Sequence, residues 1–425
     1  MSEDENLSFS TRAIHSDDNN AKNVFSDISP PLHVSSTYKY PVSYNYDIGV
    51  RKGVFSDPDE LRKHIIGLNI NSEVDTADPH VYSRYSTDTR DRLETVLGSL
   101  EGGHATTYSS GLAAIAAAFA FYQPTRLILP HAGYFGTHGV ASIFRRSRPH
   151  VQILVLEDFL ETYTDFGAGD LVWLEMPQNP NGEIYDISAF RERCKNGAVL
   201  VVDATFSPPP LMYTLELGAH CVMHSSTKFL GGHSDLLGGV LAVKDLETAQ
   251  KLRQDRSFLG SVMGNMEAWL LLRSLRSLEV RVTRQSESAT TIAAWLASPP
   301  QTPEDVKPLS IVAKVYHATL QQPELLARLN SRGSGVLSVE FISTEHAFLV
   351  CNRLRLFQNA TSLGGVESLI DWRRAFDDKV SGGVCRISIG LENVEDLKAD
   401  LRRAFLEVKD ALKSESEKKI NVQSI

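Results

Sequence analysis

Short apolar stretches alternate with helical patterns from about Val81 to Leu278, and this alternation constrains the fold more than any other feature. The stretches that have the length and apolar content of buried strands are RLILP, VQILVLE, DLVWLEM, GAVLVVDA, CVMHS and GGVLAV. Among the stretches with helical periodicity are Asp88–Glu101, Gly111–Phe121 and Thr137–Arg145. Strands that alternate with helices predict an α/β fold, in which helices cover both faces of a mostly parallel sheet.

The remaining segments predict an arm before this unit and a smaller domain after it. Residues 1–80 show little regular periodicity and include a polar insertion at about 41–80. Such an arm cannot bury a core alone, so we expect it to wrap over the main body or a second subunit. A long helix is predicted over about 266–296, linking the large α/β domain (81–278) to an α+β domain (279–425) with a frayed polar tail.

Composition is that of an ordinary globular protein, with 42% hydrophobic and 22% charged residues among 425. The net charge of −9 argues against nucleic acid as a partner. No stretch reaches the roughly 18 apolar residues of a membrane span and no leader is visible, so we expect a cytoplasmic protein without a membrane partner. Four separated cysteines without a Cys-x-x-Cys pair predict reduced thiols and no metal site.

A lysine follows the strand-like stretch CVMHS, in the run His224-Ser225-Ser226-Thr227-Lys228. A primary amine at the end of a buried strand suits Schiff-base chemistry on an aldehyde cofactor such as pyridoxal phosphate (PLP). The hydroxyls of Ser225 and Thr227 could then hydrogen-bond the phosphate. Because Ser-x-Thr-Lys also occurs by chance on surface loops, this interpretation depends on the residues around it.

Three further features supply other parts of a PLP site. Asp203 ends a strand and could pair with the protonated ring nitrogen, although a polar strand terminus is about as good an interpretation in isolation. Ser110, Gly111 and Leu112 lie where a helix begins, which suits phosphate binding, although a plain serine N-cap would look the same. Tyr134 follows the strand RLILP and could stack on the pyridine ring.

Together these residues resemble the Cys/Met-metabolism family of PLP enzymes, over nearly the whole chain from about Thr11 to Leu412. This family includes cystathionine γ-synthase, cystathionine β- and γ-lyases and homocysteine-forming sulfhydrylases. The segments that carry the resemblance, in family order, are Tyr82-Ser83-Arg84, Glu175-Met-Pro-Gln-Asn179-Pro180, Val202-Asp203-Ala-Thr-Phe206, His224-Ser-Ser-Thr-Lys-Phe-Leu-Gly-Gly-His-Ser-Asp235, Ser362-Leu-Gly-Gly-Val-Glu-Ser-Leu369 and Arg386-Ile-Ser-Ile-Gly-Leu-Glu392. The resemblance implies fold type I with a seven-stranded sheet, pyridoxal 5'-phosphate as cofactor, and a homotetramer built as a dimer of dimers.

The resemblance also implies roles for individual residues. Lys228 would hold PLP and move the Cα proton, and Tyr134 would assist it. The residues implied to contact the cofactor are Tyr82 and Arg84, reaching the partner's phosphate across a dimer interface, and Ser110, Gly111, Leu112, Tyr134, Asn179, Asp203, Ser225, Thr227 and Lys228. Ser362 and Arg386 would bind the α-carboxylate of a small amino-acid substrate, with Thr361 beside them. An arginine suits that role because its guanidinium is bidentate and always charged.

The departures from the family pattern fall on the substrate side. Gly139 stands where many relatives carry a substrate-contacting arginine. Thr361 replaces a residue that is often glutamate, or aromatic in bacterial β-lyases. The segment Asp371-Trp372-Arg373-Arg374 replaces the usual Pro and Thr-His, and is either a solvated helix end or part of a reshaped distal pocket.

These departures leave several reactions open. We expect γ-replacement on an O-activated homoserine through a vinylglycine-type intermediate, as in cystathionine γ-synthase, because Thr361 leaves the distal wall without an aromatic residue. The alternatives are cystathionine γ- or β-lyase activity and γ-substitution with a non-sulfur nucleophile. A catalytically inactive binding subunit is a further alternative, against which the retained Lys228, Asp203 and Arg386 argue.

Overall fold

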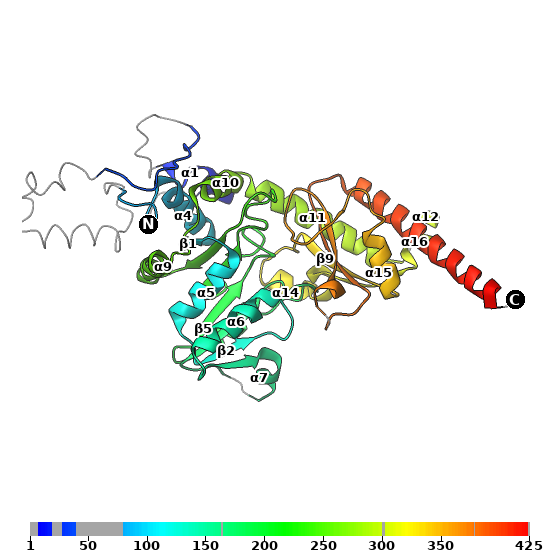
Figure 1. Cartoon of the computed structure of the whole chain (residues 1–425), viewed down its shortest axis with the longest axis horizontal. Coiled ribbons are helices and arrows are strands. Elements are labelled where there is room, and N and C mark those ends of the chain that lie inside the picture. The colour runs from blue at the N-terminus through cyan, green and yellow to red at the C-terminus, as the bar shows by residue number, and fades with distance from the viewer. Residues whose placement is uncertain are drawn as a thin grey trace, which may run out of the picture.

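Two β-sheets organise the part of the chain that the structure, a computed structural model, describes: residues 7–18, 28–39, 80–162, 165–299, 302–377 and 379–423. The predicted insertion lies outside these residues, except for its last position, His80. Within them, no helix combines the length and the apolar character needed to cross a membrane. Helix α11 runs between the two sheets, and the C-terminal helix α16 projects from the smaller one (Figure 1).

The larger sheet has seven strands in the order β1-β7-β6-β5-β4-β2-β3. Its strands are β1 (His104–Tyr108), β2 (Arg126–Leu129), β3 (Gln152–Val155), β4 (Asp170–Glu175), β5 (Val199–Asp203), β6 (Cys221–Ser225) and β7 (Gly239–Val243). Only β7 is antiparallel to its neighbours, so the prediction of a mostly parallel sheet is confirmed. The first strand was not predicted, because HATTY lacks an apolar pattern. In the structure it pairs with β7 and packs against α4 and α9.

Helices cover both faces of this sheet, as alternate residues of β4 illustrate. Leu171 and Trp173 belong to the core beneath α5, α6 and α9, whereas Val172 and Leu174 belong to the core beneath α7 and α8. These helices are α5 (Gly111–Tyr122), α6 (Phe135–Ser147), α7 (Leu156–Thr162), α8 (Ile187–Arg193) and α9 (Leu246–Leu259). A strand buried on both faces reads as a continuous apolar run, which is why the sequence located β4 well.

The first predicted helix is confirmed as α4 (Asp88–Glu101). The Thr87 side chain caps its start by accepting a hydrogen bond from the backbone of Arg90, and Gly102, with φ +73°, ends it. The next two helices extend one or two residues beyond their predicted bounds. The predicted strand VQILVLE is too long, because α7 begins within it at Leu156.

The single long helix predicted over 266–296 is wrong. The structure has two helices, α10 (Asn265–Leu275) and α11 (Leu278–Ala297). At the break, the Arg276 guanidinium donates to both carboxylate oxygens of Asp17, at 2.8 and 2.9 Å. It also donates to the last carbonyls of the arm helix α1 (Phe9–His15). The apolar periodicity continues through the break, so only this contact with the arm reveals it.

The smaller sheet has the order β10-β11-β12-β9-β8. Its strands are β8 (Val312–Tyr316), β9 (Val336–Phe341), β10 (Gln358–Asn359), β11 (Leu369–Trp372) and β12 (Val384–Ser388). Around it lie α12 (Pro303–Leu309), α13 (Ala318–Gln321), α14 (Pro323–Arg328), α15 (Thr344–Cys351), the 3₁₀ helix η4 (Arg373–Ala375) and α16 (Val394–Gln423). The polar tail predicted to fray instead continues α16 to Gln423. The domain boundaries at 80/81 and 278/279 stay predictions.

Candidate active site

A cavity of about 470 Å³ lies at the carboxyl ends of β4, β5 and β6, where ligands bind in sheets of this kind. It is bounded by the start of α5 on one side and by residues of the smaller sheet on the other. The predicted site residues that line it are Ser110, Gly111, Leu112, Tyr134, Asn179, Asp203, Ser225, Thr227, Lys228, Thr361, Ser362 and Arg386. Tyr82 and Arg84 do not belong to this lining.

Lys228 sits in a tight turn after β6, and its Nζ donates to Ser362 Oγ at 2.6 Å. Burial, together with the nearby charge of Arg386, lowers the pKa of Lys228 to about 8. The two segments are packed closely, because a Cβ on Gly364 (φ +81°) would lie 2.6 Å from the backbone nitrogen of Phe229. Glycine is therefore required where the C-terminal motif crosses the lysine turn.

The rate at which apo-protein captures PLP is expected to rise with pH through about 8 and level off above it. Only the neutral amine attacks an aldehyde, and the neutral fraction of Lys228 grows as pH passes its lowered pKa of about 8. Stopped-flow absorbance at a series of pH values measures this midpoint. A rate that keeps rising towards about 10.4, as for an exposed lysine, would contradict the lowered pKa. Arg386→Gln should move the midpoint upward, since it removes a neighbouring positive charge.

Asp203 ends β5 and presents one carboxylate oxygen to the cavity. Its Oδ1 accepts hydrogen bonds from the backbone nitrogen and the hydroxyl of Thr205, at 3.0 and 2.5 Å. Oδ2 takes part in no hydrogen bond among the described residues, so it is available to a ring nitrogen. Burial raises the pKa of Asp203, while Thr205 and the nearby His224 oppose that shift. Behind it, His224 Nε2 lies 2.8 Å from Glu101 Oε1.

The start of α5 fits both interpretations that the sequence left open. The Ser110 hydroxyl accepts a hydrogen bond from the backbone of Ala113, so it is an N-cap. A Cβ on Gly111 would lie 2.9 Å from the Cβ of Ser225, so only glycine lets the helix start approach the lysine strand this closely. The helix start therefore faces the cavity with unpaired N–H groups and the positive end of the helix dipole, which suits a phosphate.

Glu175, to which the sequence assigned no role, joins two loops of the site. Its Oε2 accepts from the backbone nitrogen of Tyr134 at 2.6 Å, and its Oε1 accepts from that of Asn179 at 3.0 Å. Burial and the neighbouring Asp203 raise the pKa of this carboxyl to about 8. Burial likewise raises the pKa of the Tyr134 hydroxyl, which therefore keeps its proton near neutral pH.

Arg386, on β12, lines the cavity on the side of the smaller sheet and is buried. Its Nη1 donates to Asn179 Oδ1 at 3.1 Å, and its Nη2 donates to the carbonyl oxygen of Ser362 at 3.0 Å. Burial, reinforced by the positive charge of Arg373, lowers the pKa of Arg386 to about 10. Arg386 therefore remains charged at neutral pH and links the predicted cofactor and carboxylate residues.

The segment 371–374 spans the end of β11 and the start of the 3₁₀ helix η4, so it is not a helix end. Asp371 and Arg373 line the cavity, as the interpretation as a distal pocket expects. Trp372 is directed away from it, because neighbouring strand residues face opposite sides of a sheet. Its indole donates to the carbonyl of Gly382 and packs edge-on against Phe348.

Other wall residues differ from the sequence-based expectation. Gly139 does not line the cavity, so other residues form the wall that the sequence assigned to this position. Phe135, Leu237 and Phe376 line it and are each more than half exposed. No pattern in the sequence identified them, since Phe135 only begins α6, and Leu237 and Phe376 are single apolar residues outside helices and strands.

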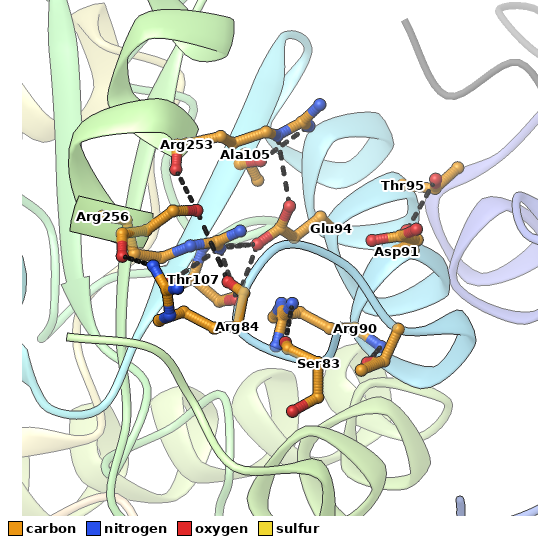
Figure 2. Close-up of polar contacts among 12 residues, drawn as sticks. Ser83, Arg84, Arg90, Asp91, Glu94, Thr95, Ala105, Thr107, Arg253 and Arg256 are labelled. Carbon is orange, nitrogen blue, oxygen red and sulfur yellow. Dashed lines mark hydrogen bonds and ion pairs between the residues drawn. The ribbon is translucent and has the colours of Figure 1, made fainter. Parts of the chain in front are cut away.

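Arg84 is held outside the cavity by a buried ionic cluster (Figure 2). Its Nη1 donates to the carbonyl of Ser257 on α9 at 2.9 Å, and its guanidinium lies over the rings of Tyr82 and Tyr85. The preceding residue, Ser83, accepts a hydrogen bond from Arg90 on α4 at 2.7 Å.

The centre of this cluster is Glu94, which is buried on α4. It pairs with Arg256 and lies 3.2 Å from Arg253, both on α9 (Figure 2). The surrounding arginines hold the pKa of Glu94 at about 2 despite its burial. The cluster therefore fixes α9 against α4 and, through Ser257 and Arg90, holds the loop that carries Arg84.

The donor set fits PLP. It offers an amine on Lys228 and a carboxylate oxygen on Asp203 without a partner among the described residues. It also offers the start of α5, which the glycine at 111 allows to approach Ser225 closely. Residues 10–406 match the model of the Cys/Met metabolism PLP-dependent enzyme family. The chain belongs to this family. It is a PLP-dependent enzyme of the trans-sulfuration type, with the fold that the resemblance implied.

Its relatives have different activities. A cystathionine γ-synthase of Mycobacterium tuberculosis is 34% identical over 345 residues, which cover 76% of this chain and 86% of that protein. A cystathionine β-lyase of Bacillus subtilis is 32% identical over 346 residues, covering 77% of this chain and 86% of that protein. The structure of a cystathionine γ-synthase from Xanthomonas oryzae pv. oryzae has a TM-score of 0.77 at 27% identity, covering 95% of this chain and 99% of that one.

Proposed function

We propose that this enzyme catalyses γ-replacement on an O-activated homoserine, as a cystathionine γ-synthase does. The observation that carries the proposal is a second hollow of about 640 Å³, which shares Thr227, Leu237, Thr361 and Ser362 with the first cavity. A replacement reaction needs room for a nucleophile beside the first substrate, and this hollow adjoins the first cavity at the shared residues. Its acidic residues Asp235, Glu267 and Glu367 suit a nucleophile that carries an ammonium group.

The residues of the first cavity have clear tasks in this reaction. Bound PLP supplies an electron sink that stabilises negative charge at the substrate Cα. The Lys228 amine removes the Cα proton, and its lowered pKa makes a neutral base available near pH 8. Asp203 Oδ2 keeps a proton on the ring nitrogen. Arg386 binds the α-carboxylate, and the protonated Tyr134 assists the leaving group.

Cystathionine β- or γ-lyase activity is the second candidate. The β-lyase relative is nearly as similar as the γ-synthase, and both reactions use the same lysine and carboxylate-binding residues. γ-Substitution with a non-sulfur nucleophile is the third. An inactive binding subunit is disfavoured by the hydrogen bond of Lys228 and by the burial of Asp203 and Arg386 in one cavity.

The candidates separate when O-acetylhomoserine, O-succinylhomoserine and cystathionine are offered singly, with and without cysteine. Keto acid, free thiol and newly formed cystathionine are measured. The γ-replacement proposal expects cystathionine to form from a homoserine ester and cysteine. Rapid release of keto acid and thiol from cystathionine, with no turnover of either ester, would favour a lyase and contradict the γ-replacement proposal.

We further propose a cytoplasmic homotetramer whose sites are shared within dimers. The position of Arg84 outside its own cavity supports sharing, as do the exposed apolar side chains at the cavity mouth. The free, buried cysteines support a reducing compartment.

Arg84→Ala is expected to weaken PLP retention at least about tenfold, because a charge-assisted hydrogen bond to phosphate is lost. Titration of apo-protein with PLP measures this, and the exposed Arg145 on α6 provides a control, Arg145→Ala. Mixing Arg84→Ala subunits with Lys228→Ala subunits tests sharing directly. If Arg84 serves the partner, hybrid dimers contain one intact site and regain activity. Unchanged affinity, or no recovery on mixing, would count against a shared site.

A further inference from the structure

The arginine assigned to the substrate α-carboxylate, Arg386, already forms an ion pair with a carboxylate of the protein itself. Asp371 on β11 is the cross-strand register partner of Arg386 on β12. Its Oδ2 lies 3.2 Å from Arg386 Nη2 and 2.7 Å from Arg373 Nη1. All three side chains line the cavity, and none of these residues is more than 7% exposed.

Whether a substrate carboxylate can bind Arg386 depends on which of its N–H groups are free. A guanidinium grips a carboxylate with two parallel N–H bonds, using Nη2 together with either Nε or Nη1. Both hydrogens of Nη2 are engaged, one by the carbonyl of Ser362 and one by Asp371. Because each fork needs an Nη2 hydrogen, neither is complete while Asp371 remains in place. The Ser362 carbonyl belongs to the backbone, so Asp371 is the acceptor that can leave.

Arg373 is placed to hold the carboxylate that leaves. It already donates to the same oxygen of Asp371, and its buried Nε has no hydrogen-bond partner among the described residues. Two arginines and one carboxylate leave one positive charge in excess. An arriving substrate carboxylate balances that charge and gives two ion pairs, substrate with Arg386 and Asp371 with Arg373.

We propose that Asp371 competes with the substrate α-carboxylate for Arg386, and that Arg373 receives Asp371 when the substrate displaces it. The proposal rests on the assignment of Arg386 under the proposed function. Asp371 keeps two buried guanidiniums from being unpaired, and it weakens carboxylate binding by the energy of the exchange. If Asp371 instead only oriented Arg386, its removal would weaken carboxylate binding, so the sign of the effect decides between the two.

The test measures ligand binding to the holoenzyme by the cofactor's absorbance. L-Norvaline carries the amine and the α-carboxylate without a leaving group, and n-butylamine is the same molecule without the carboxylate. Asp371→Asn is expected to lower the Kd of norvaline about tenfold and to leave that of butylamine within about twofold. Arg373→Gln is expected to raise the norvaline Kd about tenfold, because Asp371 then has no second partner. Arg373→Lys should restore part of the loss.

Matched controls lie in the same segment. Asp377→Asn and Arg374→Gln change residues that do not line the cavity, and neither should alter the norvaline Kd. A norvaline Kd that is unchanged or higher in Asp371→Asn would overturn the exchange, and an unchanged Kd in Arg373→Gln would do so independently. Because norvaline needs no turnover, these results do not depend on which reaction the enzyme catalyses. Binding of neither ligand, with no turnover of a homoserine ester, would overturn both the exchange and the proposed function.

Discussion

Lys228→Ala is expected to lower kcat at least about 10³-fold, because the variant loses the base that moves the Cα proton. The other groups of the cavity are poor substitutes. Arg373 and Arg386 also line it, but both are arginines and the pKa of Arg386 is about 10, and Glu175 is held by two backbone N–H groups. Steady-state kinetics on PLP-saturated protein measures the loss, with thermal melting to confirm that the variant folds.

The matched control is Lys244→Ala, at an exposed lysine just after β7. Its kcat should stay within about twofold of that of the unaltered enzyme, as for most surface substitutions. Retention of more than a tenth of kcat by Lys228→Ala would show that another group removes the proton. Partial recovery on adding a small primary amine would support the lysine amine as the missing base.

Arg386→Ala is expected to raise the KM for the amino acid at least about 100-fold, since it removes one partner of a buried, hydrogen-bonded charge site. The loss reaches beyond the substrate, because Asn179 loses a donor and Asp371 keeps only Arg373 as its cation. Arg386→Lys should be intermediate, because an ammonium retains the charge but not the fork.

Substrate saturation curves give the KM, and the Kd of butylamine, which has no carboxylate, tests whether the effect is specific. Arg328→Ala is the matched control, because Arg328 is largely exposed and pairs with Asp186 at the surface. A KM within threefold of that of the unaltered enzyme would contradict the assignment of Arg386. So would an equal loss of affinity for butylamine.

Local sequence was sufficient to predict those helices and strands whose own residues carry the pattern. Strand β4 could be located because it is apolar on both faces, and α4 because Thr87 and Gly102 bound it. Local sequence did not predict the elements that depend on distant contacts. One is β1, which pairs with β7. The other is the break between α10 and α11, where Arg276 contacts Asp17 of the arm.

The same division applies to the site. The cofactor chemistry could be inferred from the sequence, because Lys228 and Asp203 lie at the ends of apolar strands within motifs that resemble the PLP family, and in a parallel sheet such ends converge at one edge. The surroundings of Arg386 could be learned only from the folded chain. Asp371 reaches Arg386 through the register of β11 and β12, and Trp372 turns away because successive strand residues alternate in direction. Register and side-chain direction depend on strands distant in the chain, so no local pattern encodes them.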